Sequence, residues 1–139
     1  MSRTPPPIVP LPDALTQPYW DAARAGRLDI QRCGACGRWQ HPPQALCLSC
    51  GGGDLAFTPV SGKGRIHSFA IMRHDHYPSF RNRLPYVNLW VELEEQPFLI
   101  LIANLMEAAP EEAAIGRAVE VVFQPISDEI TLPQFRLIR

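Results

Sequence analysis

The sequence lacks any long hydrophobic run. Its longest unbroken apolar stretch extends only from Phe98 to Ala103, whereas a helix that crosses a membrane needs about 20 apolar residues. The first residues, Met-Ser-Arg-Thr-Pro-Pro-Pro, contain no apolar core of the kind found in a secretion signal. We therefore expect a cytoplasmic chain that makes no use of a membrane.

Charge of either sign is also scarce. Charged residues make up 19% of the 139 residues, and 13 Lys and Arg against 14 Asp and Glu give a formal net charge of −1. This balance argues against a dedicated duplex-DNA binder, which needs many cations to neutralise phosphates. Apolar residues make up 46%, which is typical of a globular protein rather than a disordered one. The length predicts one domain or two very small ones.

Motifs of the common catalytic classes are absent from the sequence. There is no G-x-S-x-G elbow, no glycine-rich phosphate loop and no G-x-G-x-x-G. The acidic pairs Glu94-Glu95 and Glu111-Glu112 fall in segments typical of turns, and we interpret them as solvated charge. We therefore expect no complete catalytic set in this chain alone.

The four cysteines stand in two closely spaced pairs. Cys33 and Cys36 form one C-x2-C motif, Cys47 and Cys50 form a second after ten intervening residues, and a glycine follows each pair. Four thiolates are the ligand set of a closed tetrahedral Zn²⁺ site, which leaves no position open for a substrate. Iron accepts the same ligands, but nothing else in the sequence indicates electron transfer. Two adjacent motifs also disfavour a redox C-x2-C. We predict a structural Zn²⁺ bound by all four cysteines.

The N-terminal segment is rich in proline. Residues 5–12, PPPIVPLP, are incompatible with a helix or a central strand, and we interpret them as an arm on the surface. Thr16 to Ala25 then predicts a short helix, with Thr16 as its cap and Gly26 as its terminator. These features define a first region at residues 1–27.

The cysteine pairs lie in a short second region at residues 28–54. Short strands are expected at Leu28 to Arg32 and at Trp39 to His41, and the run Gly51-Gly52-Gly53 marks the end of the region. So short a segment cannot fold on a hydrophobic core alone, so a metal ion would stabilise it. The pattern predicts a rubredoxin-like zinc ribbon.

Residues 55–139 show the alternation of apolar and polar residues that is typical of β-strands. Five strands are predicted, at residues 65–72, 86–93, 98–105, 118–123 and 134–138, with one helical turn between the third and the fourth. In the first strand, Ile66, Ser68, Ala70 and Met72 are expected to share one face. Five strands with this break are typical of an OB-fold, a small closed β-barrel. The predicted fold is therefore mainly β, with a short N-terminal helix, a zinc ribbon and a five-stranded OB-fold barrel.

Positive charge is concentrated in one part of this barrel. Residues 61–91 carry a formal charge of +4, whereas residues 92–139 carry −6. The basic residues are Lys63, Arg65, Arg73, Arg81 and Arg83. The loop from residue 73 to 85 also contains Tyr77 and Phe80. Arginine can bind phosphate and an aromatic ring can stack on a base, so this segment is either an anion site or an ordinary solvated loop.

The order of these parts resembles a known family, the bacterial and archaeal proteins catalogued as domain of unknown function thirty-five. The matching stretches are PYWDAARAGRLDIQRCGACG, QHPPQALCLSCGG, GKGRIHSFAIM, PYVNLWVELEE, IGRAVEVVF and LPQFRLI. Together they cover most of residues 18–138, in the order of the family. One departure is Gln96-Pro97, where the family often has a glycine in a hairpin turn.

The resemblance implies a non-catalytic accessory subunit of a thiolase-like acyl-CoA enzyme, such as a β-ketothiolase, acyltransferase or aldolase complex. The catalytic groups would belong to a larger thiolase-like or lipid-transfer-protein-like partner, and this chain would stabilise the partner and help to bind CoA or acyl-CoA. The resemblance also implies the four cysteines as metal ligands. The candidate contacts to the CoA phosphates and adenine are Lys63, Arg65, Arg73, Tyr77, Arg81 and Arg83.

Two other functions stay open at this point. A single-stranded nucleic-acid-binding protein is the main alternative, because zinc ribbons and OB-folds both serve that role, although the low overall charge argues against it. The second alternative is an enzyme that acts alone on an acyl-CoA with His67 or His74 as its base.

Overall fold

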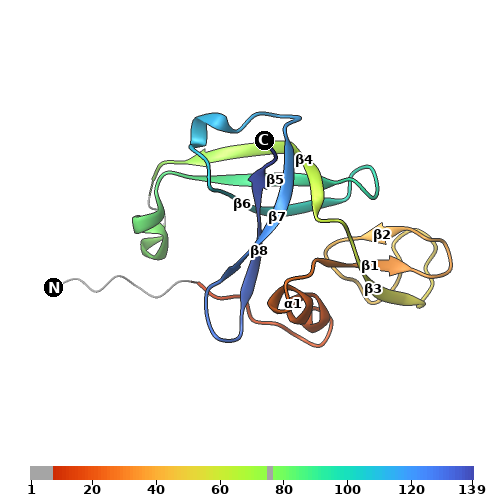
Figure 1. The fold of residues 1–139 in the computed structure, drawn as a ribbon. Coiled ribbons are helices and arrows are strands. Elements are labelled where there is room, and N and C mark those ends of the chain that lie inside the picture. The colour runs from red at the N-terminus through yellow and green to blue at the C-terminus, as the bar shows by residue number, and fades with distance from the viewer. Residues whose placement is uncertain (1–7, 75–76) are drawn as a thin grey trace.

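The chain folds into a short helix, a three-stranded sheet and a five-stranded barrel, as Figure 1 shows for the computed structural model. The structure describes residues 8–74 and 77–139, so part of the predicted proline arm lies outside the described residues. The elements are α1 (Gln17–Arg24), β1 (Asp29–Cys33), β2 (Trp39–Gln40), β3 (Leu55–Pro59), β4 (Lys63–Met72), β5 (Tyr86–Leu93), β6 (Ile100–Met106), β7 (Ala118–Pro125), β8 (Thr131–Leu137) and the 3-10 helices η1 (Pro78–Arg83) and η2 (Pro110–Glu112). The predicted fold class is confirmed.

Helix α1 begins where the sequence predicts a helix, with a proline in its first turn. The expected cap forms differently, because the Thr16 hydroxyl accepts a hydrogen bond from the Asp13 N–H and donates to the Asp13 carboxylate rather than bonding the helix. The carboxylate also accepts from the backbone N–H of Thr16 at 2.8 Å. The helix buries Tyr19 and Ala23 against the rest of the protein.

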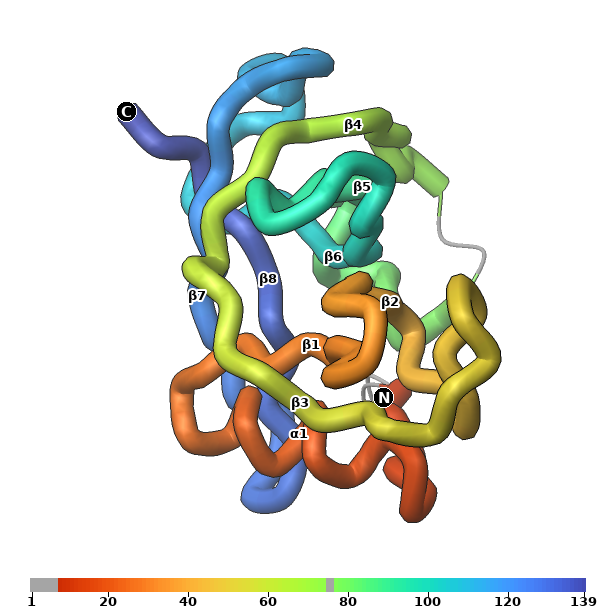
Figure 2. Tube along the Cα trace, turned by 90° about the vertical axis from the view of Figure 1, so that its right-hand side faces the viewer, coloured from red at the N-terminus to blue at the C-terminus, as the bar shows by residue number. Residues whose placement is uncertain are grey.

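The sheet of the zinc ribbon has the strand order β2-β1-β3. Strand β3 pairs with β1 along its whole length, from Leu55 opposite Cys33 to Pro59 opposite Asp29. The ribbon sheet therefore extends past the boundary expected at residue 54. Figure 2 shows that the chain then runs from β3 directly into the first barrel strand.

The barrel closes in the order β4-β5-β6-β8-β7. Its five strands occur at the predicted places, and η2 supplies the expected helical turn before β7. A register shift between Ile66 and Ser68 interrupts β4. Ile66 is buried, but beyond this bulge it is Phe69 that packs against the core. The prediction that Ile66, Ser68, Ala70 and Met72 share one face is therefore wrong, because a bulge reverses the alternation of faces.

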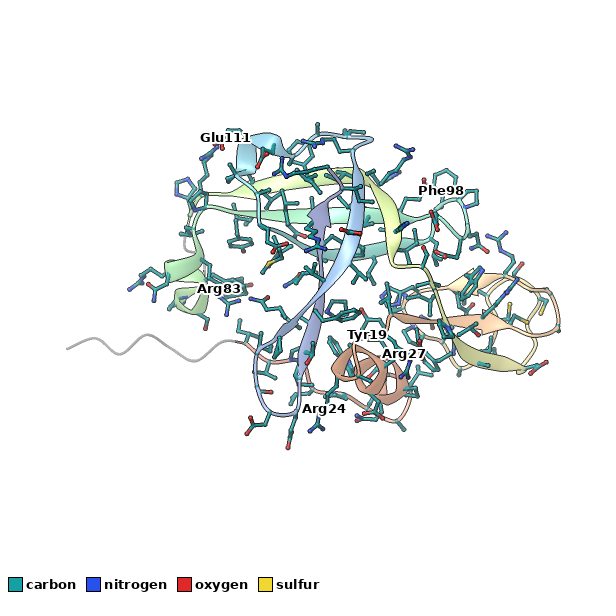
Figure 3. All side chains as sticks on the ribbon, viewed as in Figure 1. Tyr19, Arg24, Arg27, Arg83, Phe98 and Glu111 are labelled. Atoms are coloured by element: carbon teal, nitrogen blue, oxygen red, sulfur yellow. The ribbon has the colours of Figure 1, made fainter. Side chains whose placement is uncertain are left out.

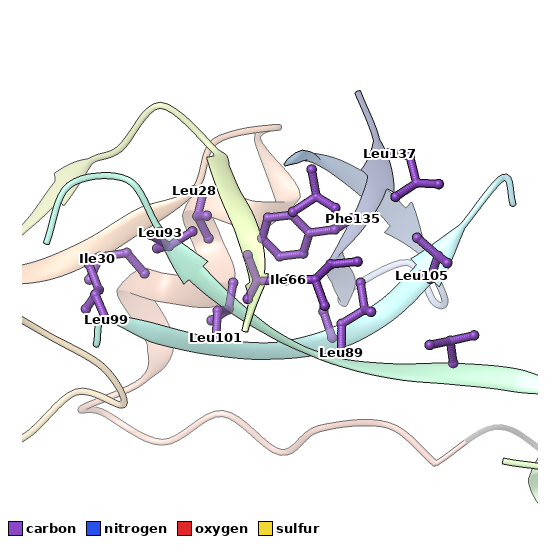
Figure 4. Close-up of a cluster of buried hydrophobic side chains, with 14 of the residues drawn as sticks. Leu28, Ile30, Ile66, Leu89, Leu93, Leu99, Leu101, Leu105, Phe135 and Leu137 are labelled. Atoms are coloured by element: carbon purple, nitrogen blue, oxygen red, sulfur yellow. The ribbon is translucent and has the colours of Figure 1, made fainter. Parts of the chain in front are cut away.

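The ribbon and the barrel share one hydrophobic core. Leu28, directly before β1, and Ile30, within β1, are buried in the same cluster as the barrel residues Leu101 and Phe135 (Figure 4). Apolar burial is the main driving force of folding, so a common core fixes the two parts relative to each other. Cutting the chain after the ribbon would expose both sides of this cluster.

A second contact joins the two parts through the β5–β6 hairpin. The Gln96 side chain donates to the Trp39 carbonyl at 2.9 Å and accepts from the Trp39 N–H at 3.0 Å. The glutamine thus pairs with β2 as a neighbouring strand would. The departure from the family pattern at Gln96 therefore falls on a residue that connects the barrel to the ribbon.

Helix α1 has eight residues, and no helix in the described parts of the chain has the length and hydropathy needed to span a membrane.

Candidate functional site

The four cysteine sulfurs converge on one point. The Sγ atoms of Cys33 and Cys50 are 3.6 Å apart, as are those of Cys36 and Cys47, and all four lie within 4.8 Å of one another. A tetrahedral ion with Zn–S bonds of about 2.3 Å would separate its sulfurs by about 3.8 Å. The cluster therefore fits a tetrahedral metal ion, and the prediction of a structural metal site formed by the cysteines is supported.

The two cysteine pairs are held by equivalent backbone turns. The N–H of Cys36 donates to Cys33 Sγ and the N–H of Cys50 to Cys47 Sγ, both at 3.5 Å. The glycine after each pair has a positive φ, 79° at Gly37, a conformation that residues with a Cβ rarely adopt. This geometry explains why a glycine follows each C-x2-C motif.

Backbone N–H donors also favour the charged, thiolate form of Cys47. The N–H groups of Cys50 and Ser49 point at the sulfur of Cys47 and lower its pKa to about 6. Hydrogen bonds to a charged form favour that form, and thiolates are the metal-binding species of cysteine. The fold therefore favours the metal-binding thiolate form of Cys47 before a metal ion binds.

His41 lies between the cysteine pairs in the sequence but outside the sulfur cluster. Its ring packs against Tyr19, with the centroids 5.2 Å apart, and its Nδ1 atom is buried without a hydrogen-bond partner. Burial lowers the pKa of His41 to about 4. The residue is therefore a neutral packing element between α1 and the ribbon rather than a metal ligand.

This burial predicts a pH dependence of stability that comes from His41. An unfolded histidine has a pKa of about 6.5, so the unfolded chain binds the proton first and folding is weakened below that pH. From pH 7 to 5.5 the wild-type chain should lose about 1 kcal/mol of unfolding free energy through this group. His41→Phe keeps a ring against Tyr19, and the loss it shows should be smaller by that amount. Urea unfolding of both metal-loaded proteins at the two pH values measures this, and equal losses would contradict it.

The structure divides the six candidate CoA contacts into two groups. Lys63 and Arg65 lie at the start of β4. They line a hollow of about 390 Å³, and Glu92 and Glu94 line the same hollow. One Arg65 nitrogen donates to the Gly116 carbonyl at 3.0 Å. The acidic neighbours reduce the positive field of this end of the barrel.

The other four candidates, Arg73, Tyr77, Arg81 and Arg83, follow the far end of β4. Strands rise about 3.3 Å per residue, so the ten residues of β4 separate the two groups by up to about 30 Å. In Figure 3, Arg83 lies at the end of the barrel opposite Phe98. The six residues therefore do not form one site.

The loop after β4 forms a pocket with aromatic walls. A cavity of about 380 Å³ is lined by Met72, His74, Tyr77, Phe80 and Tyr86. We call it the aromatic pocket. The ring centroids of Phe80 and Tyr86 are 5.4 Å apart. The Arg83 guanidinium lies 5.7 Å from the centre of the Phe80 ring. Tyr86 opens the next strand, and the sequence pattern predicted only its strand position.

Two family models match most of the chain. The ChsH2 rubredoxin-like zinc ribbon domain matches residues 20–56, and the ChsH2 C-terminal OB-fold domain matches residues 57–124. A DUF35 domain-containing scaffold protein of Methanothermobacter thermautotrophicus is 33% identical over 99 residues, which cover 70% of this chain and 72% of that protein. The chain belongs to the DUF35 family. The resemblance predicted from the sequence is confirmed.

Other relatives carry the names of enzymes or enzyme subunits, and two of these names include CoA. A solved structure described as Ltp2-ChsH2(DUF35) aldolase has a TM-score of 0.83 and 35% identity, covering 93% of this chain and 98% of that one. The benzoylsuccinyl-CoA thiolase subunit BbsA of Thauera aromatica is 30% identical over 118 residues, 84% of this chain and 76% of that protein. A probable enoyl-CoA hydratase alpha subunit of Thermomonospora curvata is 37% identical over 118 residues, 85% of this chain but only 36% of that protein.

Proposed function

We propose that this DUF35 chain is a non-catalytic accessory subunit of a thiolase-like acyl-CoA enzyme. The observation that carries the proposal is the likeness to the DUF35 chain of the Ltp2-ChsH2 aldolase over 98% of that chain. The name of the Thauera thiolase subunit points to the same class of partner. The partner would supply the reacting groups, and this chain would stabilise the assembly.

The chemistry of the cysteines supports a non-catalytic role. Thiolase-like acyl transfer needs a nucleophile that becomes acylated. All four cysteines of the chain belong to the sulfur cluster, and a four-sulfur site leaves a bound metal no open position for substrate. A structural Zn²⁺ would hold the two turns together and take no part in the reaction.

Co-expression with a thiolase-like acyl-CoA enzyme of the same organism tests the proposal. The two chains should purify together, and light scattering should give the mass of a hetero-complex that persists through dilution. Recovery of this chain alone at its monomer mass of 15.6 kDa, with the enzyme assembled without it, would contradict the proposal.

We further propose that the aromatic pocket binds the adenine and phosphate end of CoA in this complex. Tyr77 is 62% exposed, so its ring is open to a stacking base, and stacking is worth about 1–3 kcal/mol per base. Arg73 follows β4, Arg81 and Arg83 lie in η1, and these cations would pair with phosphates. Lys63 and Arg65 lie too far away to share these phosphates.

Substitutions in the two basic groups should therefore act differently on CoA affinity. In the purified complex, Tyr77→Ala and Arg83→Gln should each weaken CoA binding about tenfold, the effect of one lost stacking or charged contact of about 1.4 kcal/mol. Lys63→Gln removes the same charge at the other end of the barrel and should change affinity less than twofold. Calorimetric titration with CoA measures all three. Equal effects of Arg83→Gln and Lys63→Gln would contradict the placement.

A further inference from the structure

An apolar groove lies between helix α1 and the outer edge of strand β6. It has a volume of about 520 Å³, and its walls include Tyr19 and Trp20 from α1, Pro42 from the ribbon, and Trp90 and Ile102 from the barrel. All three parts of the protein thus contribute to one concave surface. Because these parts share one core, the groove is a formed feature of the fold.

The lining of this groove is uncharged at neutral pH. Its two titratable groups are Tyr19 and His41. Burial raises the pKa of the Tyr19 phenol and lowers that of His41 to about 4, so both stay neutral. An ionic group transferred into such surroundings loses its hydration without compensation, so the groove is complementary to an uncharged occupant.

Two large side chains on the barrel wall are exposed to solvent. Trp90 on β5 and Ile102 on β6 are directly opposite each other in the sheet. They are 48% and 61% exposed. A tryptophan next to a concave apolar surface is typical of the residues that contribute most to protein–protein binding.

The backbone of β6 turns its polar groups toward the same groove. The Leu93 N–H donates to the Leu99 carbonyl at 2.9 Å, and hydrogen bonding alternates along an antiparallel pair. Leu101 therefore pairs with β5, whereas the N–H and C=O of Ile100 and Ile102 point away from it.

Two further observations agree with this orientation. The Asn104 N–H, two residues farther along β6, donates away from β5 to the Gln134 side chain at 2.7 Å. Strand β8 pairs with β6 only at Leu105 and Met106. Within the described chain, the N–H and C=O of Ile102 consequently have no hydrogen-bond partner, and they form an open strand edge beside the groove.

We propose that this groove receives an extended, uncharged apolar segment of the partner enzyme, which pairs with the free edge of β6 as an added strand. This inference rests on the proposed function, because it assumes a partner enzyme. Strand addition combines main-chain hydrogen bonds for affinity with side-chain pockets for specificity. The open edge supplies the first, and the uncharged wall around Trp90 supplies the second. A charged segment would be rejected by the desolvation of its charge.

A matched pair of substitutions tests the docking site. Ile102→Asp places a carboxylate in the groove, whereas Ile115→Asp makes the same change at an isoleucine that is 71% exposed and lies outside the groove. We expect Ile102→Asp to weaken binding of the thiolase-like enzyme at least 30-fold, the loss of about 2 kcal/mol typical of a central interface residue. Ile115→Asp should change binding less than threefold. Melting temperatures of both variants alone establish that each is folded.

Hydrogen exchange supplies an independent measurement on the wild-type protein. The Ile102 amide should exchange at least tenfold more slowly in the complex than in the free chain, because an added strand accepts its hydrogen bond. A complex that forms without this protection, or that tolerates Ile102→Asp, would overturn the docking site and leave the proposed function standing. Failure of the wild-type chain to form any complex would overturn both. Equal protection of the amide by octanoyl-CoA without the enzyme would assign the groove to a small ligand and overturn the proposal.

Discussion

Replacing Cys36 by serine is expected to abolish metal binding and to destabilise the whole chain. Structural zinc sites bind with apparent free energies of about 10–16 kcal/mol, and that energy contributes to folding. Leu28 and Ile30 connect the ribbon to the barrel core, so loss of the ribbon would also expose part of that core. We expect a loss of several kcal/mol, which for a chain of this length lowers the melting temperature by about 10 °C or more.

Elemental analysis and thermal unfolding together measure this effect. The wild-type chain should contain one metal ion, and the Cys36→Ser variant less than a tenth of that. Ser49→Ala is the matched control, because Ser49 lies between two ligands and donates only its backbone N–H to the Cys47 sulfur. A metal-free wild-type chain with unchanged melting behaviour would show that the sulfur cluster is not a structural metal centre.

Truncating Phe135 is expected to produce the second large effect. Phe135 on β8 is completely buried at the centre of the shared core (Figure 4). Phe→Ala changes in cores cost about 3–5 kcal/mol, because they remove apolar burial and leave a cavity. A domain is stable by only about 5–15 kcal/mol, so this variant should be close to the limit of folding.

The matched control is the same change at an exposed phenylalanine. Phe98 is 79% exposed at the β5–β6 hairpin, so Phe98→Ala should change the unfolding free energy by less than about 0.5 kcal/mol. Urea unfolding of the metal-loaded proteins gives both values. Similar losses in the two variants would mean that Phe135 does not lie in the core described above.

The gathering of the four cysteines into one cluster could be predicted from the sequence, because the information for each turn is local. Each C-x2-C turn is set by four successive residues and the glycine that follows. Most barrel strands could also be predicted, since alternation along a strand directly reports which face is buried. Strand β3 could not be predicted, because residues 55–59 become a strand only by pairing with β1, more than twenty residues earlier. The bulge at Ile66 is likewise set by neighbouring strands rather than by the local pattern.

The surfaces proposed to bind CoA and the partner enzyme could be predicted only in part from the sequence. The composition of the basic loop showed that it contains aromatic residues, and the structure adds that the ring centroids of Tyr77 and Phe80 are 6.4 Å apart. The number of cations between Lys63 and Arg83 did not reveal that they form two groups. These groups lie at the two ends of the long strand β4 and are therefore far apart in space. The apolar groove combines a helix, the ribbon and two strands, so no local pattern contained it.

Activity measured with separated and combined subunits tests the accessory role most directly. The thiolase-like enzyme and this chain are assayed for carbon–carbon bond cleavage or formation on an acyl-CoA, each alone and then together. An accessory subunit predicts no turnover by this chain alone and an activity of the mixture that exceeds that of the enzyme by itself. Turnover by this chain in the absence of the enzyme would contradict the assignment.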